Sequence, residues 1–228
     1  PVAFVDLSAE DAKAYNDAIP FSTLPNPAAR PFRFAGGAED RARALDCMAA
    51  GVLYEAGDDA EGERAVAQVV LNRLRHPAFP KTICGVIFEG QERSTGCQFS
   101  FACDHALSRW TPTADQWRRA RAVADAALSG AVYRPVGYAT DYHTDWVVPY
   151  WQASLDKVAG PVGEALIMTA FGGTAVRSPL IPKQPCKEFC AIVKGLSVQT
   201  RGPMRFHSSK LPARGPSASS PRPQQKSR

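Results

Sequence analysis

Three stretches of the chain repeat apolar residues every three or four positions, which is the spacing of one buried helix face. These stretches span residues 41–55, 60–75 and 113–129. Shorter patterns at 136–143 and 146–151 predict two strands around a turn, and 82–88 predicts a short buried segment. Residues 96–103 read as a turn-rich loop. The pattern therefore predicts a mainly helical α+β protein with a small strand region.

The two ends of the chain differ from this middle. Prolines at 20, 25, 27 and 31 break any long helix, so residues 1–40 are expected to be a lead-in or linker. Residues 1–160 carry a net charge of −4, whereas residues 161–228 carry +9 and are rich in proline. We expect a domain at 41–160 and a disordered basic tail at 161–228. The tail lacks a base-reading motif, which argues against specific nucleic-acid binding. No apolar run is long enough for a membrane span.

Glu55 is the first candidate for chemistry. It stands beside Tyr54 at the end of an apolar helix. A half-buried carboxyl has a raised pKa, which suits a general acid near neutral pH. Gln68 and Asn72 lie one helical turn apart, and their amides offer donors and acceptors to sugar hydroxyls. The alternatives are a surface glutamate and a solvated helix face.

Cysteine and histidine leave several chemistries open. Four cysteines in the central module allow three disulfide pairings in an oxidising compartment: Cys47, Cys84, Cys97 and Cys103. They lack the tight spacing of a zinc site, so no metal is expected. His143 lies between tyrosine and aspartate and can bind metal, transfer a proton or simply orient a neighbour. A Cys–His nucleophilic pair stays open unless the cysteines are paired. Cys186 and Cys190 are interpreted as incidental thiols.

Taken in order, the motifs resemble the SleB/CwlJ cell wall hydrolase family over residues 43–158. Tyr-Glu-Ala (54–56) is similar to its Glu-Ala motif, and Gly-Glu-Arg-Ala-Val-Ala-Gln-Val-Val-Leu-Asn-Arg-Leu (62–74) to its Asn-Arg signature. Residue 63 is Glu where the family usually has Gln. Three later pieces also match: Phe-Pro-Lys-Thr-Ile-Cys-Gly-Val-Ile-Phe (79–88), Cys-Gln-Phe-Ser-Phe-Ala-Cys-Asp (97–104), and Tyr-His (142–143) with Pro-Tyr-Trp (149–151).

The resemblance implies a lysozyme-like fold with a small antiparallel sheet, and cleavage of peptidoglycan glycan strands without a cofactor. It implies that Glu55 is the acid and base of a lytic transglycosylase, which forms a 1,6-anhydro product. Residues expected to shape the substrate cleft are Gln68, Asn72, Gln98, Phe99, Tyr142 and His143. The substrate and the cysteines favour the periplasm or cell envelope. We expect the pairs Cys97–Cys103 and Cys47–Cys84, which give one local loop and one helix tie.

The chain departs from the family after Ala159, where a closing segment is usual and Gly-Pro-Val-Gly-Glu-Ala-Leu-Ile-Met (160–168) follows. A shift of reading frame or a divergent natural tail would each account for the change, and a missing closing strand would impair folding. Three functional alternatives remain. They are a hydrolytic muramidase, a non-catalytic peptidoglycan-binding module, and an amidase or peptidase that uses a cysteine or a metal.

Overall fold

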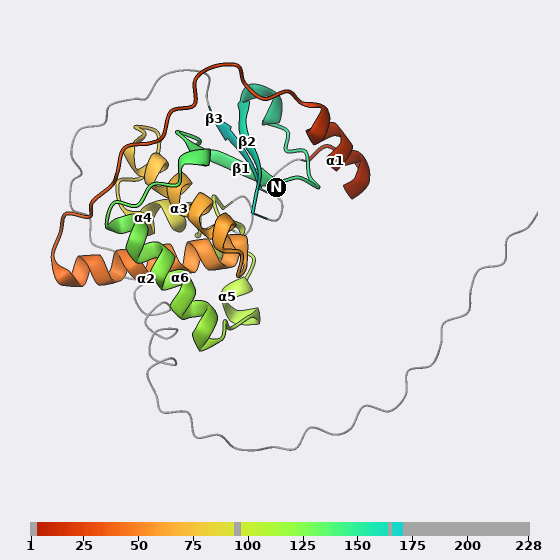
Figure 1. Cartoon of the computed structure of the whole chain (residues 1–228). Helices are drawn as coiled ribbons and strands as arrows, with labels where there is room; N and C mark the ends of the chain where they lie inside the picture. The colour runs from red at the N-terminus through yellow and green to blue at the C-terminus, as the bar shows by residue number, and fades with distance from the viewer. Residues whose placement is uncertain (1–3, 94–96, 164–165, 171–228) are drawn as a thin grey trace, which may run out of the picture.

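The computed structural model describes residues 4–93, 97–163 and 166–170. Helices dominate, and a three-stranded antiparallel sheet lies at one end of them (Figure 1). The α-helices are α1 (Ala9–Ala18), α2 (Ala38–Ala56), α3 (Ala60–Arg75), α4 (Ile83–Ile87), α5 (Ala106–Arg109) and α6 (Ala114–Leu128). The strands are β1 (Asp141–Thr144), β2 (Asp156–Val162) and β3 (Leu166–Ala170), and short 3-10 helices lie at Ser100–Ala102, Arg134–Val136 and Gln152–Ser154. The predicted α+β class is confirmed.

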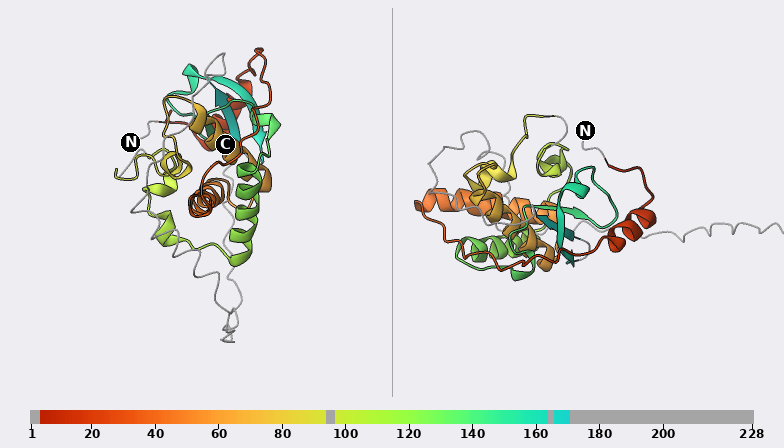
Figure 2. Two further views of the ribbon diagram at one scale, coloured as in Figure 1. Left: turned by 90° about the vertical axis from the view of Figure 1, so that its left-hand side faces the viewer. Right: turned by 90° about the horizontal axis from the view of Figure 1, so that it is seen from above.

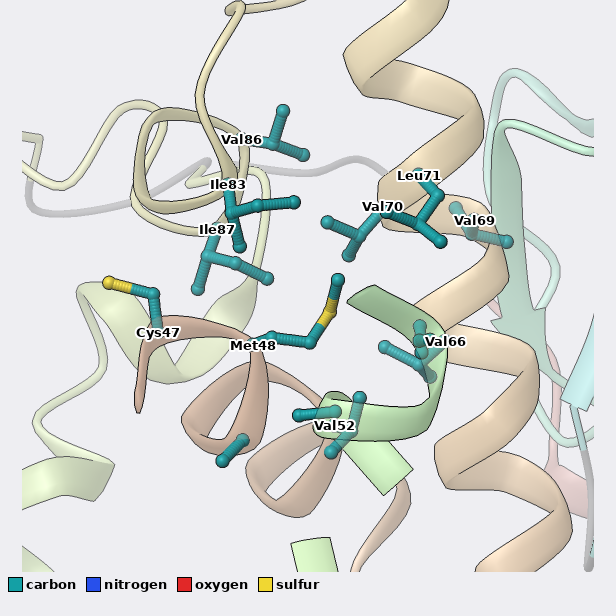
Figure 3. Close-up of a cluster of buried hydrophobic side chains, with 14 of the residues drawn as sticks. Cys47, Met48, Val52, Val66, Val69, Val70, Leu71, Ile83, Val86 and Ile87 are labelled. Carbon is teal, nitrogen blue, oxygen red and sulfur yellow. The ribbon is translucent and has the colours of Figure 1, made fainter. Parts of the chain in front are cut away.

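Helices α2, α3 and α6 build the core, as the apolar periodicity predicts. The Asp59 side chain caps α3 by accepting from the Glu61 backbone N–H, and Thr113 with Gln116 forms a capping box at α6. The apolar faces meet in a cluster in which Met48, Val66 and many neighbours are fully buried (Figure 3). Trp117 also lies inward, at 3% exposure. This core fixes the end of α2, where Glu55 lies.

The buried segment expected at 82–88 is the short helix α4. Thr82 caps it by accepting from the Gly85 N–H, and its apolar side chains enter the core beside α2. A disulfide joins Cys47 of α2 to Cys84 of α4. The predicted helix tie is therefore confirmed.

The sheet has the order β1-β3-β2, with both pairs antiparallel. Tyr142 of β1 pairs with Met168 of β3, and Asp156 of β2 pairs with Ala170. Two sequence predictions fail here. Residues 146–151 contain turns and one isolated bridge, between Pro149 and Phe4, in place of a strand. The domain boundary expected at residue 160 falls inside the sheet, because the central strand β3 comes after it; most of the predicted tail, 171–228, lies outside the described residues.

The expected lead-in is also structured. Ser8 caps α1, and the helix lies at the edge of the molecule beside the sheet (Figures 1 and 2). Asn16 of α1 is fully buried and donates to the backbone carbonyls of Asp145 and Val147. The ammonium group of Lys157 in β2 donates to the Asn16 carbonyl at 2.8 Å. Residues 4–19 thus belong to the same folded unit. Among the described residues, no helix combines the length and apolarity that a bilayer crossing requires.

Candidate active site

Glu55 lies in the last turn of α2, which ends at Gly57 with a positive φ of 63°. The side chain is half-buried, and Oε2 accepts a 2.8 Å hydrogen bond from the Tyr142 hydroxyl of β1. Oε1 is buried, and no group in the described part of the chain makes a hydrogen bond of normal geometry to it. A carboxyl that is withdrawn from water is costly as an anion, so burial favours the acid form.

The pKa of Glu55 is raised to about 6, and burial is the main cause. Three groups oppose this rise: the Tyr142 hydroxyl, the positive charge of Arg73 and the backbone amide of Ser100, whereas the Asp104 carboxylate adds to it. Glu55 therefore exchanges its proton close to neutral pH, as an acid that later acts as a base must do.

Tyr142 is a hydroxyl donor that stays neutral. Its pKa lies well above the ordinary tyrosine value because loss of contact with water and the nearby Glu55 carboxyl both disfavour the phenolate. Phe99, which is fully buried, packs against the Tyr142 ring with centroids 6.4 Å apart. The structure thus brings Tyr142 to Glu55. It places Phe99 beneath this pair as support, out of solvent, and the expected role of Phe99 in shaping the cleft stays a prediction.

The loop after α4 forms a second side of the site. A disulfide joins Cys97 to Cys103, as predicted, and the 3-10 helix Ser100–Ala102 lies within that loop. The Tyr54 ring stacks on Phe101 at 5.2 Å, and its hydroxyl donates to the backbone carbonyl of Trp110. Residues next to Glu55 are therefore held against this loop.

Arg73 of α3 was missed as a site residue by sequence reasoning. Its side chain is 3% exposed, and its charge acts on Glu55. With the Gln98 amide turned so that its oxygen faces the guanidinium, both terminal nitrogens of Arg73 donate to Gln98 at 2.9 Å. Gln98, a predicted cleft residue, thus belongs to the Glu55 neighbourhood through Arg73. Arg73 is the arginine of the Asn-Arg signature, so the motif marks the residue. The motif does not reveal which groups the Arg73 side chain contacts.

Gln68 and Asn72 lie away from Glu55 and are used inside the protein. They are 2% and 5% exposed. Asn72 donates to the carbonyls of Gly137 and Ala139 at 3.0 and 2.8 Å, and Gln68 accepts from the Tyr133 N–H at 3.1 Å. Their expected role in shaping the substrate cleft stays a prediction, and this burial gives both amides partners inside the protein. Both amides hold the segment that leads into β1.

His143 also points away from Glu55. Successive strand residues face opposite sides of a sheet, so Tyr142 and His143 diverge. His143 is buried, its Nδ1 lies 2.9 Å from the Thr144 carbonyl, and its ring meets Trp151 edge-on. Burial lowers its pKa, so the neutral ring is favoured. The structure gives His143 a packing role on the far face of β1.

The arrangement disfavours thiol chemistry at the described cysteines. Both disulfides consume the thiols that a Cys–His pair would need. Across residues 4–93, 97–163 and 166–170, no group of three His, Cys, Asp or Glu side chains is placed to hold a metal ion. Cys186 and Cys190 lie outside the described residues. A groove of about 320 Å³ between α3 and α6, lined in part by Arg64, Leu71 and Tyr133, is separate from the residues around Glu55.

A comparison with known protein families agrees with the motifs. Residues 57–163 match the model of a family described as cell wall hydrolase; the match begins just after Glu55. The crystal structure of the catalytic domain of the Bacillus cereus SleB protein is similar, with 23% identity, 60% of this chain and 95% of that chain covered, and a TM-score of 0.42. A comparison with curated proteins finds no match. The family match, which covers just under half of the chain, and the ordered motifs support a cell wall hydrolase of SleB/CwlJ type.

Proposed function

We propose that this protein is a lytic transglycosylase that cleaves peptidoglycan between N-acetylmuramic acid and N-acetylglucosamine, in the periplasm or cell envelope. The observation that carries the proposal is the Glu55 carboxyl. It is buried, held by Tyr142 through one oxygen, and has a pKa of about 6. The family match supplies the substrate class.

The chemistry asks Glu55 to act twice. As an acid it protonates the glycosidic oxygen, and the bond breaks through an oxocarbenium-like transition state. As a carboxylate it then takes the proton of the muramic acid C6 hydroxyl, whose oxygen attacks C1 and closes the 1,6-anhydro ring. The nucleophile belongs to the sugar, so a single carboxyl suffices. The Tyr142 hydroxyl and the Arg73 charge stabilise the carboxylate between the two steps.

The test is mass spectrometry of soluble muropeptides released from purified sacculi by wild type and by Glu55→Gln. We expect anhydro-muropeptides from wild type and a loss of about 10²–10⁴-fold in Glu55→Gln, the usual contribution of a general acid. The amide keeps the shape of the side chain, and circular dichroism checks the fold.

Two other outcomes would contradict the proposal. Products with reducing ends would identify a hydrolytic muramidase, in which water replaces the C6 hydroxyl. Absence of release from a folded wild type that still binds sacculi in a pull-down would identify a peptidoglycan-binding module.

A further inference from the structure

Arg73 is a buried cation that ties two other parts of the chain to α3. Its Nε donates to the carbonyl of Thr140, and a terminal nitrogen lies 3.4 Å from the Asp141 carboxylate at the start of β1. With the Gln98 amide turned so that its oxygen faces the guanidinium, both terminal nitrogens also donate to that oxygen at 2.9 Å. The guanidinium also stacks over Phe99 at 5.3 Å. A planar fork with five donors can join these groups at once, which a lysine ammonium cannot do.

The tethered parts are the ones that surround Glu55. Thr140 and Asp141 directly precede Tyr142, the residue that donates to Glu55. Gln98 and Phe99 directly precede Ser100, the residue whose backbone amide favours the carboxylate. Movement of either segment would displace a group that acts on Glu55.

We propose that Arg73 is a positioning residue for Glu55: its guanidinium holds β1 and the 97–103 loop in register on either side of the carboxyl, and its charge steadies the carboxylate formed after proton transfer. This inference rests on the proposed function. The charge of Arg73 lowers the pKa of Glu55 against the effect of burial, and this effect does not depend on the identity of the substrate.

Two substitutions separate the tether from the charge, and the same helix offers a matched control. Arg73→Lys keeps the cation and loses the fork, whereas Arg73→Met loses both. Arg75 is a similar guanidinium, which donates to the carbonyls of Arg30 and Pro31 and stacks over Phe32 at 5.5 Å. Arg75→Lys and Arg75→Met therefore report the cost of losing such contacts away from Glu55.

The readouts are muropeptide release from sacculi and the pKa of Glu55, measured by NMR titration of full-length protein with carboxyl-labelled glutamate and assigned with Glu55→Gln. We expect Arg73→Lys to lose about tenfold or more in rate, because small misplacements are costly, and to change the pKa of Glu55 less than Arg73→Met does, because the cation is kept. We expect Arg73→Met to raise that pKa. Neither Arg75 variant should change the pKa.

The proposal is overturned if Arg73→Lys keeps the wild-type rate, or if a folded Arg73→Met leaves the pKa of Glu55 unchanged. If Arg73→Met does not fold, the rate of Arg73→Lys alone tests the proposal. A wild type without activity would contradict the proposed function, and the titration would still test the effect of Arg73 on Glu55.

Discussion

Two glutamates near the α2–α3 junction have raised pKa values, and their surroundings differ. Glu55 has a hydroxyl donor and a nearby cation, which limit the rise of its pKa. Glu63, in the first turn of α3, is 1% exposed, and its Oε1 has no hydrogen-bond partner among the described residues. The pKa of Glu63 is raised to about 7, by burial first and then by the charge of Asp58. Neighbouring groups stabilise the ionised Glu55 carboxylate, whereas ionisation of the Glu63 carboxyl lowers the stability of the fold.

Glu63→Gln should stabilise the protein at high pH. The folded-state pKa of about 7 exceeds the ordinary value of 4.5, so the carboxyl favours folding below pH 4.5, and this contribution is lost as the pH rises through 7. The shift corresponds to at most about 3 kcal/mol at pH 8. We expect urea unfolding to show a gain for Glu63→Gln at pH 8 and little difference at pH 4.

Glu61→Gln is the control for this prediction, because Glu61 lies in the same turn with a side chain that is 61% exposed. An equal gain in both variants would mean that the burial of Glu63 is not the cause. A gain for Glu63→Gln that persists at pH 4 would contradict the titration argument.

At the scale of elements, helix α3 connects the core to the site. One face supplies apolar side chains, and the other supplies Gln68, Asn72 and Arg73. The apolar repeat of about 3.6 residues predicted helix α3. Its two ends were also predicted correctly, because the capping and proline signals that mark them are local in sequence. It did not predict what covers the polar face. Amide side chains on a helix give the same sequence pattern whether water, sugar or a buried loop covers them. The loop that covers Gln68 and Asn72, residues 133–140, lies more than 60 residues away in sequence.

Asn72→Ala should therefore reduce stability and leave substrate affinity unchanged. The variant leaves the carbonyls of Gly137 and Ala139 buried without their donor, which costs about 2–4 kcal/mol. Chemical denaturation measures the loss, and the KM on solubilised glycan strands is measured well below the melting temperature. Arg64→Ala, on the same helix with a 45% exposed side chain, is the control and should change stability by less than about 0.5 kcal/mol. A raised KM in a stable Asn72→Ala protein would identify Asn72 as a sugar contact.

The whole molecule extends beyond the matched family region on both sides. Helix α1 precedes residues 57–163, and β3 follows them as the central strand of the sheet. Sequence reasoning missed both for the same reason. The proline-rich lead-in and the change of charge after residue 160 are strong local signals of irregular chain, whereas pairing across the sheet and burial of Asn16 are tertiary. The Cys47–Cys84 and Cys97–Cys103 pairs were predictable, because few pairings of four cysteines were open.

Asn16 tests whether α1 is part of this unit. Its amide donates to the carbonyls of Asp145 and Val147 at 2.6 and 2.9 Å and accepts from Gln152 at 2.8 Å, with the whole residue out of solvent. Asn16→Ala leaves these groups unpaired around a small cavity, so we expect a loss of about 2–4 kcal/mol in the free energy of unfolding.

Asn26→Ala is the matched control. Asn26 makes one 3.3 Å hydrogen bond to the Pro135 carbonyl at a partly exposed position, so its loss should cost less than about 1 kcal/mol. If residues 1–40 were only a linker, the two variants would unfold at the same denaturant concentration as wild type. A single cooperative transition that shifts only in Asn16→Ala would instead mean that α1, the sheet and the Glu55 site fold as one body.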